Sequence, residues 1–161
     1  MTRKMQVSTD KNTGAKFQLA QLNVAEFLTS RDAPEVTPFI HALDEINALA
    51  DAADGFVWRL QDEVGDAMSF NPYGDDTIVN MSVWRDRESL FNFTYKTAHA
   101  NIMARRKEWF KMPVRNHFVL WWVPAGHVPA IGEAIDRLEI LRSEGPSPLA
   151  FTFKQPFDSI G

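Results

Sequence analysis

The sequence predicts an α+β domain built on an antiparallel sheet, and three observations support this class. Short segments rich in β-branched and aromatic residues alternate with amphipathic segments in the order β-α-β-β-α-β-α-β. The 161 residues suffice for one domain with a sizeable core, and the composition, 45% hydrophobic and 24% charged, is that of an ordinary globular protein. The first six elements match a ferredoxin-like fold, in which helices cover one face of the sheet.

The predicted strands are short apolar runs bounded by turn residues. They lie at 17–24, 55–61, 77–84, 117–123 and 149–157. The segment 62–76 is rich in Gly, Asp, Asn and Pro, so we expect it to be a loop. The polar residues 1–16 are expected to form a flexible leader before a single domain that spans 17–157.

The predicted helices carry apolar residues at helical spacing. They span 36–53, 86–110 and 131–144. Asp86 is a suitable N-cap for the second helix, which we expect to break near residues 96–98. Gly145 and Pro146 follow the third helix, as is typical of a helix end.

Composition excludes several classes of function. The chain has no Cys, so disulfides, thiol nucleophiles and thiolate metal sites are excluded. The net charge of −4 gives no overall positive field for nucleic acid or an anionic membrane. No signal peptide or membrane-spanning run is present, and we expect a cytoplasmic protein. The sequence also lacks GxGxxG, P-loop, GxSxG and H-x-x-x-H patterns, so we expect no dinucleotide, nucleotide-phosphate or dedicated metal site.

Aromatic residues on the strands predict a homodimer. Twelve Phe and five Trp are many for this length, and a large aromatic side chain buries roughly 150–250 Å². Strands that hold Trp58, Met81, Trp121 and Trp122 cannot leave both faces of the sheet to water at acceptable cost. If helices cover only one face, a second subunit is the simplest cover for the other.

Several stretches together resemble an uncharacterised domain family of the dimeric α+β barrel superfamily, of the antibiotic-biosynthesis-monooxygenase type. They are INALADAADGFVWRLQ (46–61), NMSVWRDRESL (80–90), HANIMARRKEWF (99–110), LWWVPAGHVP (120–129) and GPSPLAFTF (145–153). The resemblance implies two sheets, one from each subunit, that close into a barrel with the helices outside. It also implies a ligand pocket between the sheet and the helices of each subunit. Members of the superfamily include cofactor-independent oxygenases and haem-binding proteins, so the fold alone does not choose the chemistry.

The candidate site centres on the second predicted helix. Tyr95, His99 and Arg106 are separated by four and seven residues, so one stripe of a continuous helix would present all three. They would supply a proton donor, a base and an anion clamp to an aromatic pocket. In some relatives a His on the corresponding helix ligates haem iron, which the resemblance extends to His99, with Arg106 near a propionate. The alternative is structural: His99 bonds to a loop backbone, and Arg106 stabilises the C-terminus of the helix.

Polar and aromatic residues on the strands extend the candidate site. Asn80 is a candidate catalytic donor, and Asn23 and Ser82 are candidates for binding a substrate carbonyl. Trp58 and Trp121 are candidates for stacking on a substrate, although a place in the core or an interface is the favoured interpretation. Asn47 lies on the apolar face of the first helix, where an amide that ties the helix to a loop is the simpler interpretation.

The sequence therefore supports three functions. The first is a cofactor-independent, monooxygenase-like oxidoreductase that acts on a small apolar or aromatic molecule, with His99 as the base. The second is a haem protein with His99 as the axial ligand. The third is a non-catalytic ligand-binding or interaction module.

Overall fold

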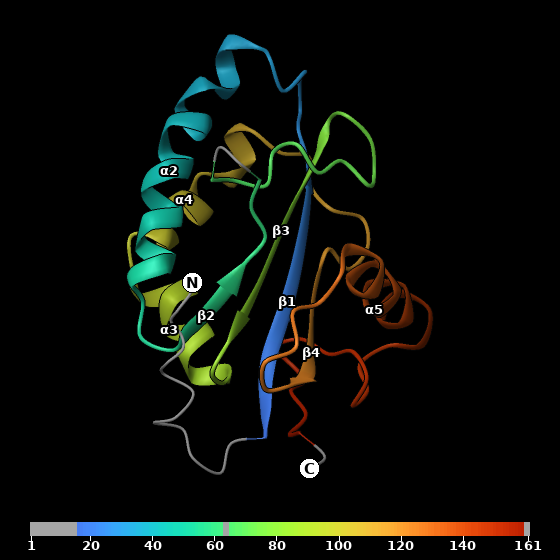
Figure 1. Ribbon diagram of the computed structural model, residues 1–161. Coiled ribbons are helices and arrows are strands. Elements are labelled where there is room, and N and C mark those ends of the chain that lie inside the picture. The colour runs from blue at the N-terminus through green and yellow to red at the C-terminus, as the bar shows by residue number, and fades with distance from the viewer. Residues whose placement is uncertain (1–15, 63–64, 160–161) are drawn as a thin grey trace.

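A four-stranded antiparallel sheet organises the chain in the computed structural model, which describes residues 16–62 and 65–159 (Figure 1). The strands are β1 (Phe17–Glu26), β2 (Phe56–Arg59), β3 (Thr77–Trp84) and β4 (Phe118–Pro124). Their order across the sheet is β2-β3-β1-β4, with every neighbouring pair antiparallel. This is the strand order of a β-α-β-β-α-β unit, and the predicted α+β, ferredoxin-like class is confirmed. The predicted leader lies outside the described residues, apart from Lys16.

Helices lie on both sides of this sheet. They are α2 (Thr37–Ala52), α3 (Arg87–Lys96), α4 (His99–Ala104) and α5 (Ile131–Glu144), with 3₁₀ turns η2 (Pro34–Val36) and η3 (Arg106–Glu108). Helices α2, α3 and α4 cover one face, and α5 covers the other (Figure 1). In the described part of the chain, no helix is long and apolar enough to cross a membrane.

The pleat of β1 and β3 separates two kinds of side chain. Ala20, Leu22 and Val24 face α5 and pack against Ala134 and Leu138. The intervening residues of β1 face the opposite helices and include Gln21 and Asn23, which stand opposite Ser82 and Asn80 of β3. Successive side chains of a strand point to opposite faces, so the pairing places four polar groups on the face that α2, α3 and α4 cover.

The reason that we gave for a homodimer does not hold in this structure. The face that a second subunit was expected to cover is covered within the chain, by α5 and by Phe70 and Tyr73 of the 62–76 loop. Met81 is 2% exposed and Trp121 is fully buried without a partner chain. The homodimer therefore stays a prediction, without that physical support.

The predicted break in the long second helix is confirmed, and it changes the geometry that we expected. Helix α3 ends at Lys96, and α4 begins at His99. The hydroxyl of Thr97 donates to the Phe93 carbonyl at 2.6 Å and accepts from the His99 amide at 3.2 Å, which satisfies backbone groups on both sides of the corner. A single helical stripe through Tyr95, His99 and Arg106 is therefore wrong, because these residues belong to α3, α4 and η3.

The predicted strand at 149–157 is reduced to isolated bridges. Phe151 exchanges two backbone hydrogen bonds with Leu120 of β4, at 2.8 and 2.9 Å, and the ladder goes no further. The aromatic residues that predicted a strand instead pack on the sheet, with Phe153 stacked on Phe118 and Phe157 against Phe151. This segment thereby closes one end of the face that α2 and α3 cover.

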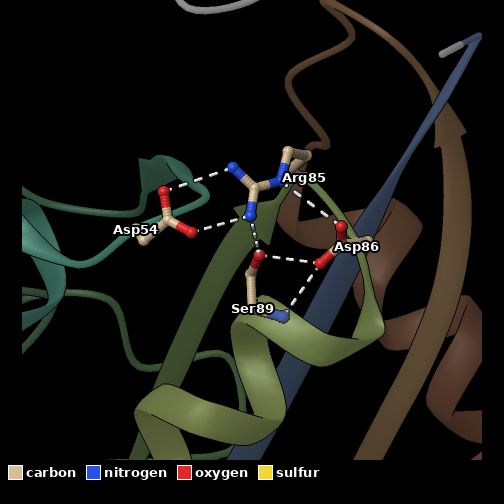
Figure 2. A network of polar contacts seen from close by, with 4 residues as sticks. All are labelled: Asp54, Arg85, Asp86 and Ser89. Carbon is tan, nitrogen blue, oxygen red and sulfur yellow. Dashed lines mark hydrogen bonds and ion pairs between the residues drawn. The ribbon is translucent and has the colours of Figure 1, made fainter. Parts of the chain in front are cut away.

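A polar network fixes the start of α3 (Figure 2). The Asp86 carboxylate accepts from the amide and the hydroxyl of Ser89 at 2.8 and 2.7 Å, as an N-cap does. Arg85 donates to Asp54 at 2.8 Å and to the Ser89 hydroxyl at 3.0 Å. The hydrogen bond and charge of Arg85 hold the pKa of Asp54 below its ordinary value. The network ties α3 to the turn before β2, and so orients the helix that leads to His99.

Candidate functional site

A cavity of about 560 Å³ lies between the sheet and helices α2, α3 and α4. Its walls are largely apolar and include the aromatic rings of Trp84, Phe93, Phe110 and Phe153. A volume within the range of small-molecule sites, with a few convergent polar groups, is typical of a ligand pocket. The cavity under the predicted second helix, on which the functional hypotheses depend, is therefore present.

His99 lines this cavity, and one of its ring nitrogens has no partner among the described residues. Its Nδ1 lies 3.1 Å from the carbonyl oxygen of Thr94, and a carbonyl only accepts, so Nδ1 carries the proton. In the neutral ring Nε2 then keeps its lone pair. Among the residues that the structure describes, nothing bonds to Nε2. The structural interpretation expected a bond from His99 to a loop backbone, whereas the bond goes to a carbonyl of α3. This bond leaves the other nitrogen as a base.

Burial keeps this imidazole neutral. Desolvation lowers the pKa of His99 below its ordinary value, and the hydrogen bond to Thr94 opposes this only in part. The ring also packs against Phe93, with centroids 5.0 Å apart. A perturbed pKa in a cleft marks a candidate catalytic group, and here the perturbation favours the basic form at neutral pH.

Polar side chains of β1 and β3 form a ladder on the cavity floor, in which hydrogen bonds join Gln21, Asn80 and Ser82. Gln21, which is 3% exposed, donates from Nε2 to Asn80 Oδ1 at 2.6 Å and to Ser82 Oγ at 2.8 Å. Trp84 Nε1 also donates to Ser82 Oγ, at 2.8 Å. The ladder follows from the antiparallel register, which places Gln21 opposite Ser82 and Asn23 opposite Asn80.

The ladder leaves hydrogen-bond donors for a ligand. Ser82 Oγ already accepts two hydrogen bonds, so its own proton is free to donate. Asn80 accepts through Oδ1, so both protons of its Nδ2 are available. Within residues 16–62 and 65–159 neither donor has an acceptor. Asn80 and Ser82 can therefore bind an oxygen that gains negative charge.

Asn23 also lines the cavity. Its Oδ1 has almost no accessible surface and accepts no hydrogen bond from the described residues. A buried oxygen without a donor costs free energy, on the order of 1–3 kcal/mol.

Arg106 and His117 carry the basic character of the cavity at one end. The Arg106 guanidinium lies over the ring of Phe110, 5.9 Å from its centroid, and forms no ion pair with a described residue. Burial lowers the pKa of Arg106. Burial and then the charges of Arg106 and Arg142 lower the pKa of His117. The alternative role for Arg106, stabilising a helix end by bonding to its carbonyls, has no supporting contact.

Tyr95 lies at the edge of the cavity. Its side chain is 46% exposed and contacts the rings of Phe91 and Phe153, 4.7 and 6.0 Å from centroid to centroid. The phenol makes no hydrogen bond to a described residue. It lines the same cavity as His99 but stands at the exposed side, so its role as a proton donor stays a prediction.

Trp58 and Trp121 do not line the cavity, and we remove them from the site. Both pack in the cluster on the α5 face, and Trp121 Nε1 donates to Glu133 of α5 at 2.9 Å. Register explains the error, because Trp121 stands opposite Ala20, whose side chain points away from the cavity. Of the predicted site residues, those that line the cavity are Asn23, Asn80, Ser82, Tyr95, His99 and Arg106.

Among the described residues, sequence reasoning missed five polar residues of the cavity, which are Gln21, Asn47, Arg59, Thr94 and His117. Gln21 lies two residues before Asn23 on β1, and this spacing alone could have placed both on one face. Asn47 is 8% exposed and lines the cavity, and no hydrogen bond ties it to a loop as we expected. His117 was named only as the start of a strand. Its place in the cavity follows from long-range pairing, in which its carbonyl accepts from Val24 at 2.8 Å.

Three solved structures resemble the chain at low identity. A protein of unknown function from Nitrosomonas europaea has 17% identity and a TM-score of 0.46, over 73% of this chain and 99% of that one. The cofactor-independent oxygenase SnoaB from Streptomyces nogalater has 13% identity and a TM-score of 0.44, over 69% and 95%. A dabb family protein with a ferredoxin-like fold from Mesorhizobium loti has 13% identity and a TM-score of 0.39, over 70% and 98%.

A comparison with family models covers more of the chain than these structures do. No curated protein matches the chain. A family model described as Domain of unknown function (DUF3291) matches residues 18–161, which is most of the chain. This confirms the predicted resemblance to an uncharacterised domain family, and the chain belongs to the DUF3291 family.

Proposed function

We propose that the chain is a monooxygenase-like oxidoreductase that acts on a small apolar or aromatic molecule without a bound cofactor. The observation that carries the proposal is His99, which lines a largely apolar cavity, whose Nδ1 is held by Thr94 and whose Nε2 has no partner among the described residues. A base of this kind can remove a proton from an acidic C–H group, since the apolar walls keep the imidazole neutral at pH 7.

Molecular oxygen is the oxidant in the reaction. His99 Nε2 takes a proton from a CH₂ group that is activated by neighbouring rings, and the carbanion transfers one electron to oxygen. Combination of the two radicals forms a C–O bond, and the proton on His99 returns to give a hydroperoxide. Loss of water then breaks the O–O bond and leaves a carbonyl group. The balance is R₂CH₂ + O₂ → R₂C=O + H₂O.

The polar ladder has a role in the same reaction. Proton removal places negative charge on the substrate, and a conjugated carbonyl oxygen would carry much of it. Asn80 Nδ2 and Ser82 Oγ–H are the free donors for that oxygen. Gln21 holds both side chains in place through its hydrogen bonds to them. Donors held in place before the reaction stabilise such a charge without reorganisation.

Oxygen uptake with anthrone, a quinol-like aromatic substrate, tests the proposal. We expect His99→Ala to lower kcat/KM by roughly 10²–10⁴-fold, the usual contribution of a general base. His41→Ala is the matched control, because His41 is an exposed residue of α2 and lies outside the cavity. Equal turnover by the wild type and His99→Ala would remove His99 from the mechanism and contradict the proposal.

Haem binding, with His99 as the axial ligand, is the second candidate, and the bond to Thr94 also favours it. A metal-bound imidazole usually donates its other ring N–H to a carbonyl or carboxylate, as His99 does. His99 and Arg106 would hold the iron and a propionate, and bound haem would supply redox chemistry with oxygen or peroxide. Addition of haemin should then shift the Soret band in the wild type but not in His99→Ala. An unchanged spectrum in the wild type contradicts this candidate.

A non-catalytic binding module is the third function that the sequence allowed. A solidly packed interface between helices and sheet, with His99 on the surface, would have favoured a pure interaction module. The cavity and the half-buried His99 do not have that form. Ligand binding with no oxygen uptake and no haem spectrum would assign the chain to a binding function.

A further inference from the structure

The charges that line the cavity are all of one sign. Its ionisable basic side chains are Arg59, His99, Arg106 and His117, and no Asp or Glu of the described residues lines it. Arg59 is neutralised locally, since it pairs with Asp51 at 2.7 Å and donates to the Gly65 carbonyl at 2.6 Å. Arg106 has no such partner among the described residues. A single half-buried guanidinium is thus left without a counter-charge.

The burial of this guanidinium carries a free-energy cost. A cation that loses water without gaining a carboxylate or another acceptor carries an uncompensated desolvation cost. Arg105 and Arg142, which lie outside the cavity, show the usual solution in the same chain: each forms an ion pair with a Glu three residues away, at 3.0 Å. Arg106, in contrast, has no ion pair with a described residue.

The same end of the cavity holds a second basic group that suits an acid. His117 is close enough for the charge of Arg106 to affect its ring. A planar guanidinium binds a carboxylate through two parallel hydrogen bonds.

We propose that the cavity binds an aromatic carboxylic acid, with the carboxylate on Arg106 and the aromatic body against the apolar walls near His99. This inference deepens the proposed function by naming the substrate class, and it rests on that function only for the step that follows binding. The ring system fills the space between Trp84, Phe93 and Phe153. The carboxylate supplies the counter-charge that the described residues do not.

Two isosteric probes test the proposal directly. Naphthalene-2-carboxylate and naphthalene-2-carboxamide have the same shape and differ in charge, and calorimetry measures the affinity of each. We expect the wild type to bind the carboxylate roughly tenfold or more tightly than the amide, the usual difference for a charge-assisted hydrogen bond. In Arg106→Met the preference should fall to about twofold or less, with amide binding unchanged. Lys107→Met is the matched control, since it removes the same charge from an exposed neighbour outside the cavity.

Each result decides the proposal. Equal affinity for the two probes in the wild type, an unchanged preference in Arg106→Met, or no binding of either probe at about 1 mM would overturn it. If Arg106→Met does not fold, Arg106→Lys should give an intermediate preference. The affinity of the wild type should then fall for the carboxylate, but not for the amide, when the salt concentration is raised from about 0.05 M to about 0.5 M. An equal change in affinity for both probes would overturn the proposal.

Binding and turnover separate this inference from the proposed function. Selective binding of the carboxylate through Arg106, without oxygen uptake by any quinol-like substrate, would support the acid site and contradict the oxygenase. Oxygen uptake that depends on His99 but not on Arg106, with no preference for the carboxylate, would support the oxygenase and overturn the acid site.

Discussion

The Nδ1 of His99 donates to the carbonyl oxygen of Thr94 across 3.1 Å, from the first residue of α4 to the last turn of α3. This one bond has two consequences. It satisfies a carbonyl that the end of α3 leaves without an amide partner. It also fixes the tautomer of the ring, so that the nitrogen left for chemistry is Nε2. The same hydrogen bond thus satisfies the end of α3 and fixes the tautomer of the proposed base.

The free energy of unfolding should fall in acid through His99. Burial lowers the pKa of His99 in the folded state below its ordinary value of 6.5. Below that pH the unfolded chain takes up a proton that the folded chain does not, so stability is full above pH 6.5 and is lost as the pH falls. His99→Gln can keep a donor to Thr94 but does not titrate. Urea denaturation at about pH 7.5 and about pH 5.5 should show a smaller loss in this variant.

A second histidine contributes to the pH dependence of the free energy of unfolding. The pKa of His117 is lowered by burial and by Arg106 and Arg142, so it acts in the same direction. The double variant His99→Gln, His117→Gln should lose more of the pH dependence than either single variant. An identical loss of stability in the wild type and His99→Gln would contradict the assignment to His99.

Gly55 should not tolerate a side chain. It has a φ of +85°, and a Cβ built on it would lie 2.1 Å from the Ser89 hydroxyl, inside the network of Figure 2. We expect Gly55→Ala to destabilise the fold by about 2–4 kcal/mol, through strain at positive φ and displacement of Ser89. Gly126 is the matched control, because it has a φ of +89° but nothing lies within 4 Å of the position that a Cβ would take. Gly126→Ala should cost about 1 kcal/mol, and equal losses in the two variants would show that the contact with Ser89 is unimportant.

Ser82 should be required for the ladder beneath the cavity. Ser82→Ala leaves the N–H groups of Gln21 and Trp84 without their shared acceptor. The expected cost is about 1–3 kcal/mol in unfolding free energy, because both donors are buried. Ser69 is exposed and its hydroxyl makes no bond to a described residue, so Ser69→Ala should be neutral. A neutral Ser82→Ala in urea denaturation would show that another acceptor replaces the hydroxyl.

Asn47 should matter for binding and not for folding. Its side chain lines the cavity wall, and no described residue is shown to bond to its amide. Asn47→Leu puts a larger apolar side chain there without breaking such a bond, so the free energy of unfolding should change by less than about 1 kcal/mol. Affinity for naphthalene-2-carboxylate should fall, because the new side chain occupies part of the site. Ala48→Leu adds the same side chain on the exposed face of α2 and should leave that affinity unchanged; a matching loss there would contradict the argument.

Much of the fold could be predicted because its signals are local. The run TIVNMSVW of β3, the N-cap Asp86 and the stop at Gly145 each depend on residues within one element. The face on which α5 packs could not be predicted, since it depends on how a helix after the last core strand returns to the sheet. The segment 149–157 has the composition of a strand, but β4 pairs with it only at Leu120.

The site could be predicted only in part, for a related reason. His99 and Arg106 were found by residue type and spacing, although the helix between them is not continuous. Trp121 was misplaced because alternation along a strand separates two sets of side chains but does not tell which set faces the cavity. Helices cover both faces of this sheet, so burial does not distinguish them either. Register between β1 and β4, a long-range property, decides which side chains share a face.

The central claim is that His99 is a neutral base in the cavity with Nε2 unprotonated, and nitrogen NMR of its ring across pH tests this most directly. We predict a protonated Nδ1 and an unprotonated Nε2 at neutral pH, with a pKa below the ordinary 6.5. A proton on Nε2 at neutral pH, or a pKa above 6.5, would contradict the account.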